Sequence, residues 1–378
     1  MQPMQSESDL QVHLMEVFAR RTGVTTGGGS RRYLWTDAFA LLNALDLYRI
    51  TGEERWRDLS VALIDDVHAV LGRHRSDDPR SGWLSGLPEE EGARHPTCGG
   101  LRIGKPLPER GPSDPFDERL EWERDGQYWH YLTKWMDALS RAAAILRAPV
   151  YGSQAVELAR ATLPAFLHAG RNGLAWKMSV DLSRPLVPRA SPHDALDGYV
   201  TLRWLTCTED RETLAEETAV LLELARDRDW ATGDPLGLGG LLLDACRLAR
   251  LPDRTPQDDA LAGAILTGVD VGLSHLLRQG TLDLPSETRL GFRELGLAIG
   301  LRALPRTLDF TRGTPDLARA VLPHLERLDQ RRSVAARIIA FWSDPANRAV
   351  PTWTEHRDIN EVMLATALLD AYTGTALS

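Results

Sequence analysis

Residues 121–135 read E-W-E-R-D-G-Q-Y-W-H-Y-L-T-K-W and form an unusual start for a helix. Three tryptophans, two tyrosines, a histidine and several charged residues fall within these fifteen positions. An ordinary amphipathic helix separates apolar and charged side chains onto opposite faces. Here both kinds crowd together where helical periodicity begins, at about residue 126. The pattern predicts a helix start at which some of these side chains face a ligand.

Helical periodicity dominates the rest of the chain, and strand signals are nearly absent. Leu, Ala, Arg and Glu, which are good helix formers, predominate between turn signals such as T-G at 51–52 and S-D-P at 343–345. The predicted helices cover residues 8–22, 33–51, 54–72, 126–147, 150–169, 192–207, 210–228, 236–250, 257–278, 288–304, 315–342 and 357–374. One alternating segment, L-A-W-K-M-S-V-D-L at 174–182, favours a strand or hairpin.

The predicted helices come in pairs with short connections, which is typical of antiparallel helical hairpins. An open solenoid of such pairs repeats its sequence at a fixed period, and this chain has no such repeat. The sequence therefore predicts an all-α fold, an (α/α)6 toroid of about six hairpins. We expect residues 1–378 to form a single domain of this kind.

Alternate helices begin differently, and one set is rich in aromatic and titratable residues. This set starts at about residues 33, 126, 192, 236, 288 and 357. In a toroid the inner helices run parallel, so their starts meet in a funnel at one end. The catalytic candidates at these starts are Asp37, Asp125, His130, His193, Asp194, His356 and Asp358. The substrate-binding candidates are Trp35, Tyr128, Asp197, Arg293, Glu294 and Glu361.

Helix capping is the alternative explanation for any single aspartate at a helix start. Capping does not explain why three of the starts also carry a histidine beside aromatic residues. Glycines at 237, 239, 240, 291 and 296 are expected to let inner helices pack closely or leave room for a ligand.

The segment from about residue 73 to 125 lacks helical periodicity, yet it is too rich in Trp, His and Leu for a disordered linker. Loops of this length in compact domains are commonly lids or binding loops. We therefore expect an ordered cover over the funnel. Its substrate-binding candidates are Trp83, His95, Arg102 and Lys105. The glycines of H-P-T-C-G-G-L-R-I-G-K (95–105) match neither a P-loop nor a dinucleotide fingerprint.

Composition excludes several classes of protein. The net charge of −9 argues against a nucleic-acid-binding surface. Three scattered cysteines predict neither a disulfide framework nor a structural zinc site. No secretion signal or membrane-spanning stretch is recognisable, so we expect a cytoplasmic protein without a membrane or nucleic-acid partner. We predict a small-molecule substrate and no metal or other cofactor, whereas the oligomeric state is open.

Carboxylates and histidines among tryptophans favour acid–base chemistry, because aromatic walls desolvate a carboxyl group and raise its pKa. Indole faces also stack on sugar rings, and the chain has eleven tryptophans against seven phenylalanines. Paired carboxylates suit glycoside hydrolysis, and histidines suit proton abstraction beside a carbonyl. The residues leave both chemistries open.

D-G-Q-Y-W-H-Y at 125–131 and W-T-D-A-F-A-L-L-N-A-L-D-L-Y-R-I-T-G at 35–52 resemble sequences of the six-hairpin glycosidase-like superfamily. This superfamily of (α/α)6 toroids includes glycoside hydrolases, uronide hydrolases, polysaccharide lyases and N-acylglucosamine epimerases. The resemblance implies a hydrolase, lyase or epimerase that acts on a carbohydrate in the funnel. It makes Asp125 and His130 the first catalytic candidates.

Two alternatives remain open at this stage. Terpenoid cyclases share paired-helix rings and aromatic linings that stabilise cations, although D-D-P-R at 77–80 lies in a loop and no D-x-D-D occurs. A non-catalytic helical binding scaffold is the other alternative.

Overall fold

The computed structural model describes residues 7–25, 31–208 and 214–369. The chain divides into two compact units. Unit 2 comprises Ala19–Arg226, and unit 1 comprises Met1–Phe18 together with Asp227–Ser378. The single domain over residues 1–378 stays a prediction. Parts of two predicted helices, at 210–213 and 370–374, lie outside the described residues.

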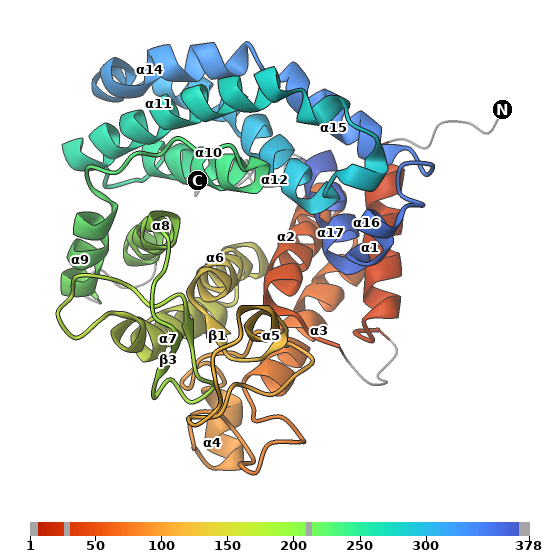
Figure 1. Cartoon of the computed structure of the whole chain (residues 1–378), viewed down its shortest axis with the longest axis vertical. Coiled ribbons are helices and arrows are strands. Elements are labelled where there is room, and N and C mark those ends of the chain that lie inside the picture. The colour runs from red at the N-terminus through yellow and green to blue at the C-terminus, as the bar shows by residue number, and fades with distance from the viewer. Residues whose placement is uncertain (1–6, 26–30, 209–213, 370–378) are drawn as a thin grey trace. The chain divides into compact units, whose positions relative to one another are not determined.

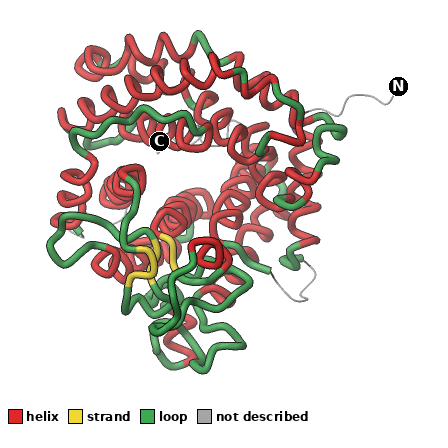
Figure 2. The backbone as a smooth tube through the Cα atoms, viewed as in Figure 1, coloured by secondary structure: helices red, strands yellow, loops and turns green. Residues whose placement is uncertain are grey.

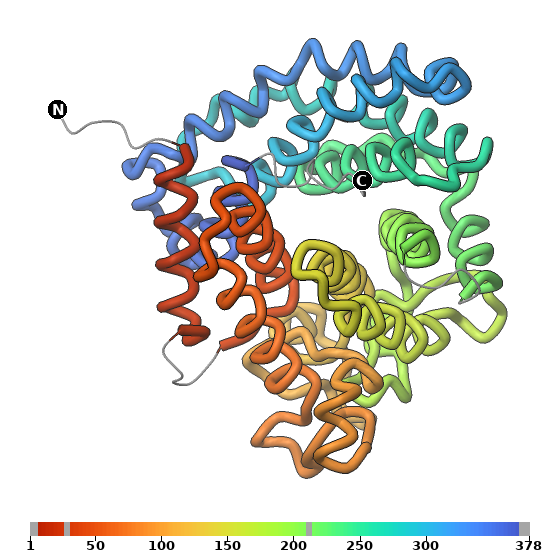
Figure 3. The backbone as a smooth tube through the Cα atoms, turned by 180° about the vertical axis from the view of Figure 1, so that it is seen from behind, coloured from red at the N-terminus to blue at the C-terminus, as the bar shows by residue number. Residues whose placement is uncertain are grey.

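Unit 2 consists of helical pairs and a small sheet (Figure 1). Helix α6 packs on α2 and on α8, and each of these three helices pairs with the next long helix in the chain. The first helices are α2 (Leu34–Thr51), α3 (Glu54–Leu71), α4 (Glu89–Arg94) and α5 (Glu118–Glu123). They are followed by α6 (Trp129–Leu146), α7 (Pro149–Phe166), α8 (Pro192–Thr208) and α9 (Ala215–Ala225). Seen from behind, α2 and α3 run side by side, as do α6 and α7 (Figure 3).

Unit 1 is built from helices that pack in the same pairwise manner. Helix α10 packs on α11 and α12, α14 covers α11 and α13, and α12 also contacts α15 and α17. The first helices are α1 (Glu7–Arg21, which ends in unit 2), α10 (Pro235–Ala249), α11 (Pro256–Gln279) and α12 (Gly291–Arg302). The last are α13 (Leu304–Arg312), α14 (Pro315–Asp329), α15 (Ser333–Ser343), α16 (Pro351–Thr354) and α17 (Arg357–Leu368). Two short 3-10 turns, η1 (Thr281–Asp283) and η2 (Ser286–Thr288), precede α12.

Helix α2 shows how composition sets burial. Every residue from Leu34 to Leu47 is buried, including Asp37 and Asn43. The helix ends at Thr51 because Gly52 takes a left-handed conformation with φ 69° and caps it. A helix that is apolar nearly all round must lie inside a protein.

Two of the glycines singled out in the sequence allow a close helix crossing in unit 1. A Cβ atom on Gly239 would lie 2.1 Å from the carbonyl oxygen of Gly296. Helices α10 and α12 can therefore touch backbone to backbone at this point. Gly240, by contrast, meets nothing within 4 Å.

The predicted strand is confirmed, and it explains one wrong helix boundary. Strands β1 (Gln127–Tyr128), β2 (Lys177–Met178) and β3 (Pro185–Val187) form an antiparallel sheet in the order β1-β2-β3 (Figure 2). Because residues 127–128 pair with β2, the helix predicted from residue 126 begins only at Trp129.

Other boundaries also differ from the prediction. The helix predicted over 315–342 is two helices, since α14 ends at Asp329 and α15 begins at Ser333. Helix α13, which follows α12 almost directly, was not predicted from the sequence. The short helices α4 and α5 inside the segment 73–125 were not predicted either.

The segment 73–125 is ordered, as predicted, and it is fastened to helices of unit 2. The Arg102 guanidinium donates to the carbonyl oxygens of Val70 and Arg73, at 2.7 Å each, and so binds the last turn of α3. The Thr97 hydroxyl donates to the carbonyl oxygen of Gln154 on α7 at 3.0 Å. The predicted role of the segment as a cover over a funnel stays a prediction.

Helix α11 is, within the described residues, the one helix long and apolar enough to cross a membrane. More than half of its apolar stretch, 56%, is buried inside the protein. Core helices of soluble proteins meet the same test, so this helix alone is weak support for a membrane span.

Buried His68 makes a testable contribution to stability. Its Nε2 lies 3.1 Å from the Trp135 Nε1 donor, and burial lowers the pKa of His68 to about 3. Below pH ~6.5 the unfolded chain gains a proton on this residue that the folded chain does not. We expect His68 to reduce the free energy of unfolding by about 2 kcal/mol between pH 6.5 and 5.

The variant His68→Gln keeps an acceptor for Trp135 but does not titrate in this range. Urea unfolding at pH 7 and at pH 5 compares the two proteins. The wild type should lose about 2 kcal/mol more than the variant on acidification. Equal losses would show that His68 is accessible to protons in the folded state.

Candidate functional site

An aromatic cluster lies where α2, α6 and the small sheet of unit 2 meet. Its members are Tyr33, Trp35, Tyr128, His130, Tyr131 and Trp176, and the name "aromatic cluster" refers to them below. Tyr131 lies edge-on to Tyr33, with ring centroids 5.4 Å apart, and Trp35 is 6.5 Å from Tyr131. Tyr33, His130, Tyr131 and Trp176 are partly exposed, whereas Trp35 and Tyr128 are buried. The cluster thus offers partly wet aromatic surface next to titratable groups.

His130 lies in the middle of this cluster. Its ring stacks on Trp176, with centroids 5.9 Å apart and an interplanar angle of 13°, and on Tyr128 at 5.5 Å and 26°. Its Nδ1 atom is 3.2 Å from Oδ1 of Asp194, although the approach is too oblique for a hydrogen bond. The other oxygen of Asp194 accepts the backbone N–H of Ser191 at 2.9 Å. His130 is therefore a partly exposed imidazole beside a fixed carboxylate.

Polar groups accompany the aromatic rings. The hydroxyls of Tyr33 and Tyr131 are 2.5 Å apart, and the Lys105 ammonium lies 5.3 Å from the Tyr33 ring centroid. Burial raises the pKa of both tyrosines, so both hydroxyls keep their protons at neutral pH. Burial also lowers the pKa of Lys105 from its usual value, while Glu123 and Asp125 oppose this shift. The Tyr128 hydroxyl is buried and has no hydrogen-bond partner within the described residues.

Asp125, the first catalytic candidate, is a loop-fixing residue in this structure. It is fully buried, and one carboxylate oxygen is 2.5 Å from Arg102 Nη1. The other oxygen accepts the backbone N–H groups of Gly104 and Gly126 at 3.0 and 3.1 Å. Both carboxylate oxygens are thus occupied inside the protein, and the catalytic role of Asp125 stays a prediction. Arg102, expected to bind substrate, is equally committed to this ion pair.

Two other catalytic or binding candidates of unit 2, Asp37 and Asp197, are also paired. Asp37 reaches back to the backbone N–H of Tyr33 at 2.8 Å and to Arg32 at 3.2 Å. This is the geometry of a helix-capping acid. Asp197 is 2.5 Å from the Lys134 ammonium and accepts the hydroxyl of Thr133.

Other sequence candidates in unit 2 separate from the aromatic cluster. Trp83 is buried within the segment 73–125, where it packs against Gly92 and under the Arg73 guanidinium. His193 is half-buried at the second residue of α8. His95 is exposed, with Nδ1 2.9 Å from Oε2 of Glu157 on α7.

The candidates in unit 1 lie at the starts of α12 and α17. Arg293 donates to Asp234, the N-cap of α10, at 2.6 Å. Glu294 is buried and accepts bonds from Arg289 and from the Trp342 indole at 2.9 Å. The Glu294 carboxylate is therefore occupied by partners inside the protein. The position of Arg293 gives no indication of a ligand contact.

The other three candidates of unit 1 belong to the first turn of α17. His356 is exposed as the N-cap residue and lies edge-on to Phe292, with centroids 5.7 Å apart. Asp358 is half-buried, and Glu361 is 4.0 Å from Arg357. The predicted gathering of all six helix starts in one funnel stays a prediction.

Sequence reasoning missed Tyr33, Tyr131 and Trp176 as members of the site. Tyr131 stood in the quoted stretch and Tyr33 directly preceded the predicted start of α2. Trp176 was hidden in the segment predicted as a strand, because a strand reaches its partners through pairings that one segment does not reveal. Trp122, exposed and 4.8 Å from the Trp176 ring centroid, extends the same surface.

One group of side chains in unit 2 has the composition of a metal site. It consists of His95, Cys98 and Glu157. Burial and a hydrogen bond to Glu157 raise the pKa of the Cys98 thiol to about 12. The group lies at the junction of the segment 73–125 with α7, apart from the sequence candidates for catalysis.

The comparisons with known proteins identify the fold. No family model and no curated protein matches the chain. A crystal structure of D-mannose isomerase is similar over 91% of this chain and 88% of its own, with a TM-score of 0.52 and 11% identity. A cellobiose 2-epimerase from Bacillus thermoamylovorans covers 84% of this chain and 85% of its own, with a TM-score of 0.48 and 8% identity.

The similarity to D-mannose isomerase confirms the predicted fold class, an all-α (α/α)6 toroid. This is the fold that the sequence resemblance to the six-hairpin glycosidase-like superfamily implied. At 11% identity the similarity shows the fold alone.

The role of Asp125 in fixing the loop can be tested by Asp125→Asn. This change leaves Arg102 buried without its counter-ion, so we expect a loss of about 3 kcal/mol in the free energy of unfolding. The matched control is Glu123→Gln, an exposed carboxylate two residues earlier, which should change stability by less than about 0.5 kcal/mol. Denaturant unfolding measures both. An Asp125→Asn protein with unchanged stability but no turnover would restore the catalytic interpretation.

Proposed function

We propose that the protein is an enzyme that acts on a carbohydrate or related polyhydroxylated molecule by proton transfer, with His130 as the base. The observation that carries the proposal is the position of His130, partly exposed, stacked on Trp176 and held 3.2 Å from Asp194. A histidine is well suited to this role because its ordinary pKa lies near neutral pH.

The two nitrogens of His130 have different surroundings. Nδ1 faces the Asp194 carboxylate, so a proton on Nδ1 leaves Nε2 free to accept one from a substrate. Asp194 would then stabilise the imidazolium that forms, as a carboxylate does in a catalytic triad. The oblique contact in the free protein is compatible with this role, since catalytic hydrogen bonds often tighten only when substrate binds.

The chemistry best matched to one such base is isomerisation or epimerisation beside a carbonyl group. His130 removes the proton from the carbon next to the carbonyl, and the electron pair moves to form an enediol. The carbonyl oxygen takes a proton as the enediol forms. In an isomerisation, His130 returns the proton to the neighbouring carbon, while the hydroxyl on the first carbon loses its proton and becomes the new carbonyl. In an epimerisation, a second group must protonate the opposite face of the first carbon, while the original carbonyl oxygen gives its proton back.

The carboxylates of unit 2 argue against a hydrolase centred on this site. Glycoside hydrolysis uses two carboxyl groups that both face the bond to be broken. Asp37, Asp125 and Asp197 are buried and paired with cations. The similarity in fold to D-mannose isomerase agrees with a sugar isomerase or epimerase, without establishing it.

The other members of the aromatic cluster have complementary roles in this proposal. Trp176, with Trp122 beside it, offers an indole face on which a sugar ring can stack. In the Tyr33–Tyr131 pair one hydroxyl donates a hydrogen bond to the other, so the second hydroxyl still has a proton to donate. In this proposal, that proton goes to the carbonyl oxygen of the substrate. Lys105 would stabilise the negative charge that develops on that oxygen. No cofactor is needed.

Deuterium exchange tests the reaction type directly. The protein is incubated in D₂O with a panel of free aldoses and ketoses that includes mannose, and the sugars are followed by proton NMR. We expect loss of the signal from the hydrogen beside the carbonyl of at least one sugar, with formation of its isomer or epimer. In parallel assays, release of the phenol from aryl glycosides without exchange would favour a hydrolase instead. Release of diphosphate from isoprenoid diphosphates would favour the terpenoid alternative, and binding without turnover would favour a scaffold.

His130 is the critical residue for this test. We expect His130→Asn to lower kcat at least about 100-fold, which is the usual contribution of a general base. The melting temperature should change little, because the ring is partly exposed. His275→Asn, at an exposed position on α11, is the matched control and should retain full activity. Full activity in His130→Asn would show that His130 is not the general base.

Lys105 should set the alkaline limit of activity. Because burial lowers its pKa, this ammonium loses its proton at a lower pH than an ordinary lysine, whose pKa is about 10.4. Activity should therefore fall on the alkaline side as Lys105 becomes neutral. Lys105→Arg keeps its charge at high pH and should move this limb to higher pH, as measured by kcat/KM against pH. An unmoved limb would exclude Lys105 from the reaction.

A further inference from the structure

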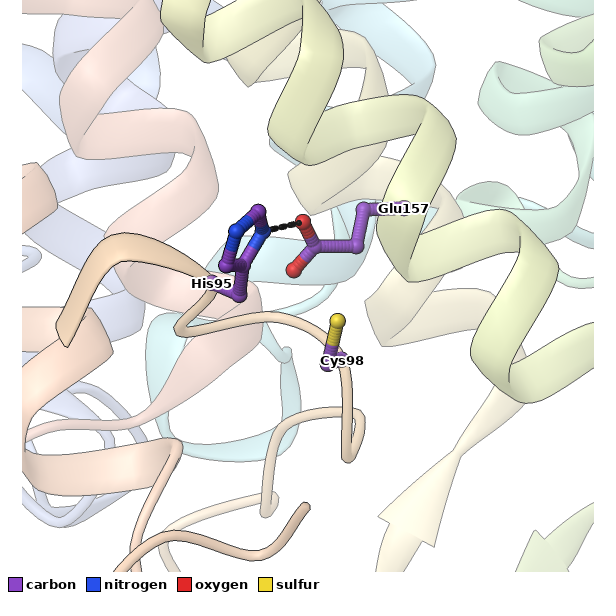
Figure 4. A group of neighbouring side chains, drawn as sticks. All are labelled: His95, Cys98 and Glu157. Carbon is purple, nitrogen blue, oxygen red and sulfur yellow. Dashed lines mark hydrogen bonds and ion pairs between the residues drawn. The ribbon is translucent and has the colours of Figure 1, made fainter. Parts of the chain in front are cut away.

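We propose that His95, Cys98 and Glu157 form a binding site for a divalent cation, with zinc as the ion that fits best (Figure 4). The inference is independent of the proposed sugar chemistry. It departs from the expectation that the chain has no metal site.

The three ligand atoms already converge on one point. They lie within 4.8 Å of one another, and His95 Nδ1 is 2.9 Å from Glu157 Oε2. A zinc ion lies ~2.0 Å from nitrogen or oxygen ligands and ~2.3 Å from sulfur. Ligand atoms around a tetrahedral zinc are then about 3.3–3.6 Å apart, so small side-chain rotations bring the thiol to the required distance.

The backbone brings His95 and Cys98 to the same side of a turn. The Cys98 N–H donates to the His95 carbonyl oxygen at 3.3 Å, and the next turn closes with Gly100 donating to Thr97 at 3.0 Å. The spacing H-x-x-C thus gives a two-residue chelate from one short turn. The third ligand, Glu157, comes from α7, so a cation would join two segments far apart in the sequence.

A neighbouring hydroxyl holds the carboxylate in place. Thr97 Oγ1 lies 3.0 Å from Oε1 of Glu157 and 3.0 Å from the Gln154 carbonyl oxygen, and the two acceptors share its one proton. With Oε1 engaged in this way, Oε2 is directed at His95. Such outer partners orient the ligands of known metal sites and strengthen their affinity.

The donor set selects the ion. A thiolate with an imidazole and a carboxylate is typical of zinc, whereas magnesium and calcium prefer oxygen ligands alone. Three protein ligands leave the fourth tetrahedral position for water. In the absence of an ion, Glu157 holds the other two side chains, through its contact with His95 and a hydrogen bond from the Cys98 thiol. Cys98 forms no disulfide.

A cation here would have a defined effect on the fold. It would bind the turn at residues 95–98 to α7 and so add a second fastening to the segment 73–125. We therefore expect zinc to stabilise the protein, because an ion that binds only the folded state raises the free energy of unfolding.

The experiment uses the full chain, stripped of metal with a chelator and then titrated with Zn²⁺ in competition with a chromophoric chelator. We expect one equivalent to bind. Co²⁺ in its place should give a sulfur-to-cobalt charge-transfer band in the near ultraviolet. Cys98→Ser should abolish this band and weaken zinc binding at least about 100-fold. Cys207→Ser, which changes another half-buried thiol of unit 2, is the matched control and should leave the band and affinity unchanged.

A second variant covers the case in which Cys98→Ser fails to fold. His95 is 48% exposed at its side chain, so His95→Gln should fold normally and lose the site. Zinc should raise the melting temperature of the wild type by several degrees and leave that of His95→Gln unchanged. Absence of a bound equivalent, or zinc binding that survives both variants, would overturn the proposal.

Discussion

The buried ion pair between Arg102 and Asp125 is the constraint on which unit 2 depends. Removing a carboxylate and a guanidinium from water is costly unless each finds full hydrogen bonding inside the protein. Asp125 meets this condition with Arg102 and two backbone N–H groups. Arg102 meets it with carbonyl oxygens at the end of α3, which lack partners within the helix itself. The pair can form only where these segments meet, so it fixes their arrangement.

The candidate site follows from that arrangement. Ile103, next to Arg102, accepts the N–H of Leu34 at the first turn of α2 and donates to the carbonyl oxygen of Gly126. One extended residue therefore joins the start of α2 to the residue before β1. Strand β1 leads directly into α6 and pairs with β2, which follows Trp176. The aromatic cluster is assembled by these backbone contacts, and its side chains pack onto a framework already in place.

Periodicity predicted the helices well because helical periodicity is a local property of the sequence. The site residues were harder to predict from the sequence than the helices. A carboxylate at a helix start has the same sequence pattern whether it caps the helix or contacts a substrate. Asp37 and Asp125 were predicted as catalytic and are occupied by backbone N–H groups and arginines. For Asp125 the distant partner Arg102 distinguishes the two roles, whereas the partners of Asp37 lie four and five residues away. The same limit hid Glu157, which lies on an ordinary amphipathic helix and gains meaning only when the turn at His95 reaches it.

Two of the contacts that hold the segment 73–125 differ in character. The Arg102–Asp125 pair is buried, so salt screens it much less than an exposed pair. The group formed by His95, Cys98 and Glu157 is partly exposed and, as proposed, complete only with a cation. His95, at one end of the stretch 95–105, belongs to the proposed cation site. Lys105, at the other end, lies three residues after Arg102 of the buried ion pair. This stretch therefore takes part in both contacts. A cation at the outer end would restrict the motion of this stretch without touching the aromatic cluster, so metal would alter stability more than chemistry.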